Sequence, residues 1–284
     1  MIKRILVALD PDEDTPVATQ YASEIAARYD GEVSGLAMVD VKQINSEVGG
    51  GAIGGLYYAE KIRTRLINMA HEQANVLTTT FDKSLSDADI KHDNVIQEGT
   101  PVRQITQEMK YHDMLVIGHT SHFLYNQPTK ETNTLPRVVK QGVSPTLIVT
   151  DEYRPISRVM IAYDGSDASA RTLQRFSQLQ PFGNDLEIYL VNVRSGNSAK
   201  DQHASDHSLN KATKFLKSHR FVRIVSSSIL GSNISEKLLE HASVIQADLI
   251  VAGAHSVSAL RRITFGSTTA ALLSKSQVPL FLFH

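Results

Sequence analysis

The chain has 284 residues, which suffices for about two domains of ordinary size, and 42% of them are apolar, enough to fill a core. Its 29 Lys and Arg residues nearly balance its 30 Asp and Glu residues, so the net charge of −1 argues against nucleic acid bound through general electrostatics. The sequence contains no cysteine, which excludes disulfides, thiolate metal sites and cysteine nucleophiles.

The N-terminal segment begins with a short apolar run that Asp10 interrupts, too soon for a signal peptide. No apolar run approaches the roughly 18 residues that a membrane-spanning helix needs. We therefore expect a cytoplasmic protein without a membrane partner.

The first half alternates short apolar runs with longer amphipathic stretches. The apolar runs predict strands at residues 5–9, 33–39, 114–117 and 146–149. Because they are largely apolar on both sides, they suit parallel strands that are covered on both faces. Val17, Tyr21 and Ile25 recur at a spacing of four, which predicts a helix. We expect Thr15 to cap this helix, with Pro16 at its first position.

A glycine-rich segment, residues 47–55, lengthens the first half after its second strand. It contains the G-x-G-x-x-G pattern of dinucleotide-binding turns. However, a mostly polar stretch separates it from the strand, and no strand about 20 residues further on ends in the acidic residue that such a site requires. We therefore interpret the segment as a flexible loop.

The second half of the chain repeats the landmarks of the first in the same order. The corresponding segments are RILVALD and RVMIAYD at 4–10 and 158–164, and DMLVIG and DLIVAG at 113–118 and 248–253. The period is too long for a solenoid, so we interpret the chain as two copies of one domain. We place the copies at residues 1–150 and 156–284, joined by a polar segment that ends in Pro155.

Strands and helices alternate in each copy, which predicts the α/β class with about five parallel strands and four helices per copy. In the second copy, Ser166 or Asp167 is expected to cap a helix that carries Leu173, Phe176 and Leu179. Ligands of such sheets bind beyond the carboxyl ends of the strands, where the strand order switches. The segments that follow the first and fourth strands are therefore the candidate binding positions.

In the second copy, these positions carry residues that suit a ligand. Asp164 directly follows the first strand, where its carboxylate can accept hydrogen bonds from ribose hydroxyls or from a base amine. Gly253 follows the fourth strand and lets the backbone approach a ligand. Gly266, with Ser267 and Thr268, opens a predicted helix whose free N–H groups and dipole attract phosphates. Each residue alone suits a turn or a helix cap, but the combination favours a ligand site.

The segment Gly253-Ala254-His255-Ser256, followed after nine residues by Gly266-Ser267, resembles the G-x2-G-x9-G-S/T phosphate loop of ATP-binding universal stress proteins, with Ser256 in place of the second glycine. The resemblance covers nearly the whole chain and implies two tandem copies of a five-stranded, adenine nucleotide α-hydrolase-like domain. It also implies ATP as the ligand, with a divalent ion, Mg²⁺ or Mn²⁺, at the phosphates. The residues that would bind the nucleotide are Ala162, Asp164, Val193, Gly253, Ser256, Gly266, Ser267 and Thr268.

The first copy departs from this pattern. Gly118 keeps the start of the loop, but counting back from the last strand places Thr132-Asn133 where the second copy has Gly266-Ser267. A side chain then occupies the position of closest approach, so we expect weak or absent nucleotide binding here. Asp40 stands where the second copy has the neutral Asn192, which is a further difference between the copies.

Other motifs do not indicate a different chemistry. The sequence has no G-x-x-x-x-G-K-[S/T], H-E-x-x-H or G-x-S-x-G motif. His119 with His122, and His203 with His207, have the spacing of metal ligands. Because no third ligand is evident for either pair, we interpret all four as surface residues.

From these features we expect a nucleotide-responsive stress regulator that binds ATP or a related adenine nucleotide in its second copy. No residue is placed as a general base near a γ-phosphate, so we expect slow hydrolysis at most, and we expect binding to order residues 257–265. One alternative is a scaffold that acts through protein contacts. For it, the resemblance implies pairing of residues 146–149 with 280–283 as a pseudo-dimer within one chain, and a homodimer stays open. Another alternative, an enzyme acting on adenine nucleotides, rests on fold analogy.

Overall fold

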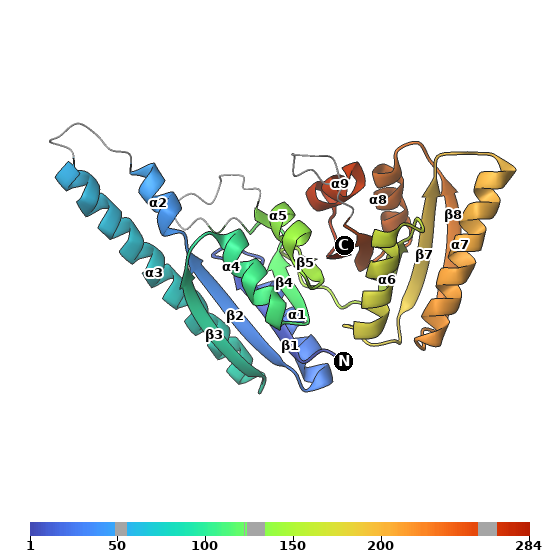
Figure 1. Ribbon diagram of the computed structural model, residues 1–284. Helices are drawn as coiled ribbons and strands as arrows, with labels where there is room; N and C mark the ends of the chain where they lie inside the picture. The colour runs from blue at the N-terminus through green and yellow to red at the C-terminus, as the bar shows by residue number, and fades with distance from the viewer. Residues whose placement is uncertain (49–55, 122, 124–133, 255–265) are drawn as a thin grey trace. The chain divides into compact units, whose positions relative to one another are not determined.

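The computed structural model describes the whole chain except residues 49–55, 122, 124–133 and 255–265. The described residues form two compact units (Figure 1). We call Lys3–Val143 the N-terminal unit, and Ser144–His284 together with Met1–Ile2 the C-terminal unit. Within the described ranges, no helix is both long and apolar enough to cross a membrane.

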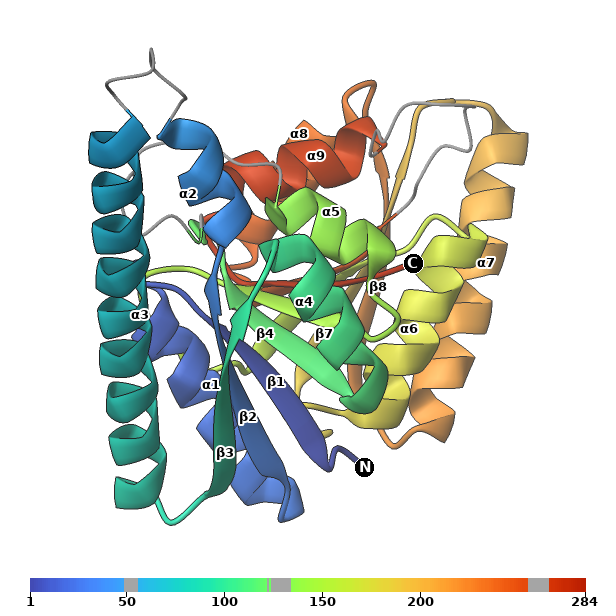
Figure 2. The ribbon, with the colours of Figure 1, turned by 60° about the vertical axis from the view of Figure 1, so that its left-hand side comes forward.

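The N-terminal unit is a parallel sheet with helices on both of its faces (Figure 2). In chain order its elements are β1 (Arg4–Leu9), α1 (Thr15–Tyr29), β2 (Glu32–Val39), α2 (Val41–Glu47), α3 (Leu56–Asp87), β3 (Lys91–Glu98), α4 (Pro101–Glu108), a 3₁₀ turn (Met109–Tyr111), β4 (Met114–Gly118) and α5 (Thr134–Gln141). The strand order is β3-β2-β1-β4, and each of these neighbouring pairs is parallel. Helices α1 and α3 cover one face, while α4 and α5 pack together on the other.

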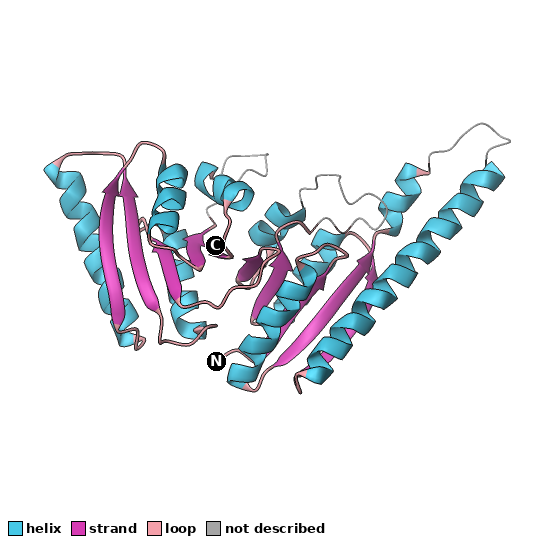
Figure 3. Cartoon of the chain, turned by 180° about the vertical axis from the view of Figure 1, so that it is seen from behind, coloured by secondary structure: helices cyan, strands magenta, loops and turns pink. Residues whose placement is uncertain are grey.

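The C-terminal unit repeats this arrangement and adds one strand from the first repeat. In chain order its elements are β5 (Thr146–Val149), β6 (Arg158–Ala162), α6 (Asp167–Leu179), β7 (Glu187–Arg194), α7 (Ala199–Ser218), β8 (Arg223–Leu230), α8 (Ile234–Val244), β9 (Leu249–Gly253), α9 (Ser267–Lys275) and β10 (Leu280–Phe283). The order is β5-β10-β9-β6-β7-β8. All pairs are parallel except that β5 runs antiparallel to β10, with Leu147 opposite Phe281. Figure 3 shows strands and helices alternating through both units.

The cores are built from the apolar strands and from one face of each covering helix. The predicted apolar faces are buried in both first helices, with Val17, Tyr21 and Ile25 in α1 and Leu173, Phe176 and Leu179 in α6. The ring of Phe176 lies edge-on to that of Phe281, with 5.3 Å between the ring centroids. This contact is part of the packing of α6 against β10.

The start of α1 differs from its prediction by one residue. The N-cap is Asp14 rather than Thr15, and the Asp14 side chain makes no capping hydrogen bond. The Thr15 hydroxyl instead donates to the Asp10 carbonyl at 2.6 Å, which ties the helix to the end of β1. In the second repeat the prediction is confirmed, because Ser166 is the N-cap of α6 and accepts from the Ser169 N–H.

The mostly polar stretch after β2 forms a helix, α2, for which the sequence analysis made no prediction. Asp40 caps α2 by accepting a hydrogen bond from the Gln43 N–H at 3.0 Å. The described part of the N-terminal unit therefore has five α-helices, one more than predicted. Most of the glycine-rich segment, residues 49–55, lies outside the described residues.

Candidate functional site

A pocket of about 240 Å³ lies at the carboxyl ends of β6, β7 and β9 in the C-terminal unit. β6 has β7 on one side and β9 on the other, so the pocket sits where the strand order switches. The structure gathers seven of the eight predicted site residues around it, namely Ala162, Asp164, Val193, Gly253, Gly266, Ser267 and Thr268. The eighth, Ser256, lies outside the described residues.

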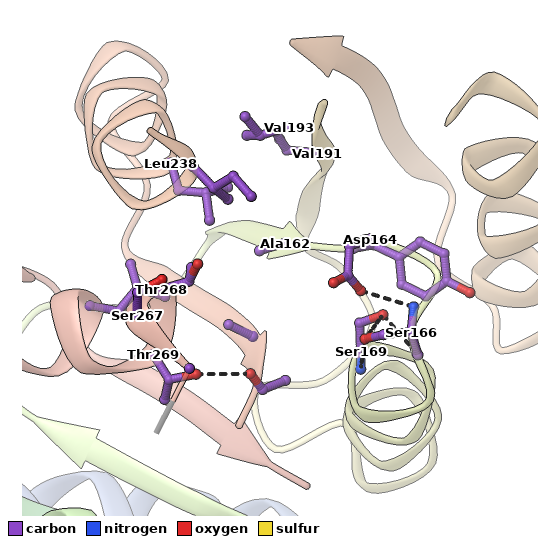
Figure 4. A pocket seen from close by; sticks show the side chains of 16 residues that line it. Ala162, Asp164, Ser166, Ser169, Val191, Val193, Leu238, Ser267, Thr268 and Thr269 are labelled. Atoms are coloured by element: carbon purple, nitrogen blue, oxygen red, sulfur yellow. Dashed lines mark hydrogen bonds between the residues drawn. The ribbon is translucent and has the colours of Figure 1, made fainter. Parts of the chain in front are cut away.

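Asp164 presents an ionised carboxylate to this pocket. One of its oxygens accepts the Ser166 N–H at 2.9 Å, and the other faces the open pocket (Figure 4). Burial alone would raise the pKa of Asp164, but hydrogen bonds from Ser166 and Ser169 outweigh burial and lower it. The group is therefore charged at neutral pH and is an acceptor for hydroxyl or amine donors.

The N-terminus of α9 forms another wall. Gly266 is its N-cap, with φ −57° and ψ 145°, a backbone conformation open to every residue type. Ser267 and Thr268 follow in the first turn and line the pocket. The first N–H groups of a helix have no partner within the helix, and the helix dipole adds positive potential there. This end of the pocket therefore favours a negatively charged group.

Gly253 is explained by packing as well as by access to a ligand. A Cβ added to Gly253 would lie 2.7 Å from the Ser169 nitrogen and 2.8 Å from the Ala168 carbonyl carbon. The Thr269 hydroxyl donates to the Gly253 carbonyl at 3.3 Å and so fixes α9 to the same strand end. The absence of a side chain at Gly253 thus lets α6 pack closely on the end of β9. The sequence had indicated only that a glycine here lets the backbone approach a ligand.

Apolar side chains from β7, α8 and α9 form the remaining wall, with Val191, Val193, Ile234, Leu238 and Leu272 among them. The contribution of α8 was not predicted. Ile234 and Leu238 are four residues apart and share one face of the helix. Their spacing does not indicate which strands that face packs against.

A hydrogen-bond relay from α7 fixes the turn that carries Asp164. Asn192 in β7 donates through its side-chain amide to the Tyr163 carbonyl at 2.8 Å. The Ser205 hydroxyl of α7 donates in turn to the Asn192 side-chain oxygen at 2.9 Å. The sequence shows that Asn192 is neutral where the first repeat has Asp40, but it does not indicate that Asn192 positions this turn. In the N-terminal unit the equivalent Asp40 caps α2 instead.

In the N-terminal unit, carboxylate side chains occupy the position at the ends of β1 and β4 that corresponds to the pocket. Asp14, which stands where the second repeat has Ala168, is 1% exposed. One of its oxygens accepts both the N–H and the hydroxyl of Thr120 at 2.8 Å. A Cβ added to Gly118 would overlap the Asp14 carboxylate. Asp10 is equally buried and accepts the Phe123 N–H. Thr132 and Asn133 lie outside the described residues.

The two repeats also differ in the ionisation of their equivalent aspartates. Burial, with the nearby Asp12 as a second cause, raises the pKa of Asp10 from 3.8 to about 8. Burial likewise raises the pKa of Asp14. Asp10 is therefore mostly protonated at neutral pH, whereas Asp164 is charged.

The histidine pairs do not assemble a larger cluster in the described chain. His203 and His207 lie one turn apart on α7 with their rings stacked and 6.5 Å between centroids. His122 lies outside the described residues. Among the described residues, no group of three or more His, Asp or Glu side chains gathers that could hold a metal ion.

Comparisons with known proteins agree with this duplicated architecture. Universal stress protein Slr1230 of Synechocystis sp. is 25% identical over 294 residues, and the alignment covers 100% of both chains. Stress response protein NhaX of Bacillus subtilis is 37% identical over 54 residues, which are 19% of this chain and 32% of that protein. The fold resembles the crystal structure of a universal stress protein from Archaeoglobus fulgidus, with a TM-score of 0.73, 17% identity, and coverage of 99% of this chain and 97% of that chain.

The family comparison covers both repeats. The model of the universal stress protein family matches residues 1–149 and, a second time, residues 155–284. These two matches account for nearly the whole chain, and the chain therefore belongs to the universal stress protein family as a member with two tandem domains.

Proposed function

We propose that the C-terminal unit binds an adenine nucleotide, with ATP as the expected ligand, and that the protein acts as a nucleotide-responsive stress regulator. One observation carries this proposal: seven residues from separate segments, selected by sequence, surround a single pocket. Within that pocket an apolar wall, a charged carboxylate and an uncapped helix N-terminus lie on different sides. That division of chemistry fits a base, a ribose and a phosphate chain.

Each part of the pocket has a role in this proposal. Val191, Val193 and Leu238 offer the apolar surface on which a base can lie. Asp164 accepts hydrogen bonds from ribose hydroxyls, and the first turn of α9 receives the phosphates. A divalent ion that accompanied the nucleotide would be held through the phosphate oxygens, which are the ligands that Mg²⁺ prefers.

The pocket is better suited to holding a nucleotide than to rapid hydrolysis. Among the described lining residues, Tyr163 and Asp164 carry the titratable side chains. Asp164 already accepts a hydrogen bond, and its lowered pKa makes it a weak general base. We therefore propose regulation through binding, with slow turnover at most. The segment expected to respond, residues 257–265, lies outside the described residues.

We expect one nucleotide per chain, because in the N-terminal unit Asp14 already accepts the Thr120 N–H that an anion would need. A second carboxylate, Asp10, lies buried beside the same loop. A phosphate that entered there would have to displace these groups, and any ionised carboxylate would repel it.

Isothermal titration of the intact protein with ATP, with and without Mg²⁺, tests the proposal. We expect saturable binding with a stoichiometry near one. Gly266→Val should abolish it, because the added side chain enters the phosphate end without straining the backbone. Asp164→Asn should weaken it roughly ten-fold by removing a charge-assisted hydrogen bond.

Thr100→Val is the matched control, because Thr100 caps α4 in a similar conformation, makes no side-chain capping bond and lies outside the pocket. This variant should bind ATP like the unmodified chain. If the unmodified protein shows no saturable binding up to millimolar ATP, the nucleotide proposal is wrong and a scaffold role takes its place.

A further inference from the structure

Helix α3 presents two faces of different character. Its inner face carries Ala70, Ala74, Phe81 and Leu85, which are at most 3% exposed, and it packs on β2 and β3. Figure 2 shows α3 along the outer border of the N-terminal unit. An amphipathic helix in this place normally turns a polar face outward.

The outer face instead carries a row of large apolar side chains, which we call the α3 stripe: Tyr58, Ile62, Met69 and Val76. Their exposed fractions are 68%, 51%, 40% and 65%. Ile62, Met69 and Val76 are seven residues apart, so they line up along roughly 21 Å of helix. A seven-residue repeat keeps its members on one side of a helix, as in the seams of paired helices; here one seam position is apolar, and the other, three residues later, carries Arg65 and Glu72. Exposed apolar surface of this length indicates an interaction site.

The charges beside the α3 stripe select the partner and its direction. Arg65 and Glu72 lie on the same flank of the stripe, and within the described part of the chain no ion pair involves either of them. If a second α3 ran antiparallel with the two Met69 residues at the centre, Ile62 would face Val76. Arg65 would then lie beside Glu72 of the other helix, twice over. An in-register parallel pairing would place Arg65 against Arg65 and Glu72 against Glu72, because residues at the second seam position face each other there, and like charges repel.

We propose that the α3 stripe is an interface with a second copy of this chain, formed by antiparallel pairing of the two α3 helices about Met69. The surface is complementary to itself, so the pairing closes as a twofold dimer and does not extend into a filament. The inference concerns the N-terminal unit and holds whether or not the C-terminal unit binds a nucleotide.

Because the chain has no cysteine, single thiols can test the centre of the interface. Met69→Cys should form mostly disulfide-linked dimer under mild oxidation, since the two thiols would meet at the twofold axis. Val244→Cys is the control for random collisions, as Val244 is 79% exposed at the end of α8 and should stay mostly monomeric. Equal crosslinking of the two variants would overturn the proposal.

The register and direction have their own test. Ile62→Cys and Val76→Cys should each crosslink poorly alone but form a mixed dimer when combined. Efficient crosslinking of Ile62→Cys with itself would indicate parallel pairing and contradict the proposal.

Charge reversal tests the two proposed ion pairs between Arg65 and Glu72, and it needs no introduced cysteine. In sedimentation velocity, Arg65→Glu should weaken dimerisation by about ten-fold, and Arg65→Glu combined with Glu72→Arg should restore it. Circular dichroism checks that each variant is folded. A monomeric unmodified chain across the concentration range, or a dimer unaffected by the single reversal, would overturn the proposal.

Discussion

At the scale of single residues, the two repeats use equivalent aspartates in opposite ways. Asp164 is held as a carboxylate by hydroxyl and N–H donors at the start of α6, and it faces a pocket. Asp10 is buried, lies near Asp12 and has a pKa of about 8. The same residue type after the same strand is thus a candidate ligand contact in one repeat and a buried structural group in the other.

The raised pKa of Asp10 predicts how pH affects stability. The folded chain keeps a proton that the unfolded chain loses above 3.8, so this group lowers the free energy of unfolding as pH rises from about 4 to about 8. Asp10→Asn imitates the protonated side chain, so the free energy of unfolding of this variant should fall less as pH rises over the same range. Urea denaturation at several pH values measures the difference between the variant and the unmodified chain.

Asp164→Asn supplies the matched comparison for this measurement. Folding lowers the pKa of Asp164, so the contribution of Asp164 to stability is present above the unfolded pKa and is lost as pH falls. The two variants should therefore change the pH profile in opposite directions. A profile that Asp10→Asn leaves unchanged would contradict the buried, protonated state of Asp10.

At the scale of elements, the candidate site depends on the close approach of β9 to α6. Gly253→Ala would press a methyl group against the backbone of Ala168 and Ser169, which cannot move aside as a flexible side chain could. We expect this variant to lose about 1–3 kcal/mol of stability, the usual cost of overpacking. Thermal or urea unfolding measures it.

Gly266→Ala is the control for this substitution, because a glycine N-cap with an ordinary φ should tolerate a methyl group at smaller cost. If the two alanine variants were equally stable, the contact between β9 and α6 would be looser than the structure shows.

Local sequence patterns predicted the existence of most elements well and their ends less well. The strands near residues 5–9 and 146–149 are found as β1 and β5, because a short apolar run between polar segments has few other ways to be buried. The cap of α1 was misplaced because the Thr15 hydroxyl bonds to the backbone at the end of β1. α2 was missed because its Asp40 cap is one residue in an otherwise polar stretch.

At the scale of the whole molecule, the proposed nucleotide should change one repeat and spare the other. Ligand at 100 times its dissociation constant adds about 2.7 kcal/mol to the stability of the state that binds it. In hydrogen exchange with saturating ATP, we therefore expect added protection in β6, the start of α6 and α9. β1, α1 and β4 should exchange as before.

The unbound chain and Gly266→Val with ATP are the controls for this experiment. Equal protection of both repeats would show that the carboxylates of the N-terminal unit do not exclude the nucleotide. That outcome would contradict a single site per chain while leaving binding itself in place.

The duplication, the α/β class and the strand ends at which a site would form could all be predicted before the fold was known. These features follow from local periodicity and from the order of residues along the chain. Both can be recognised without knowing the fold. Gly266 at the start of a helix and Asp164 after a strand were readable for the same reason.

Which residues meet, in contrast, became known from the folded chain. Asp14 reaches Thr120 across 106 residues of sequence, and Asn192 holds the Tyr163 carbonyl from a neighbouring strand. Such contacts depend on register and packing between distant elements, and no local pattern encodes them. The same reason explains why the apolar wall from α8, and the outward direction of the α3 stripe, became visible only in the folded chain.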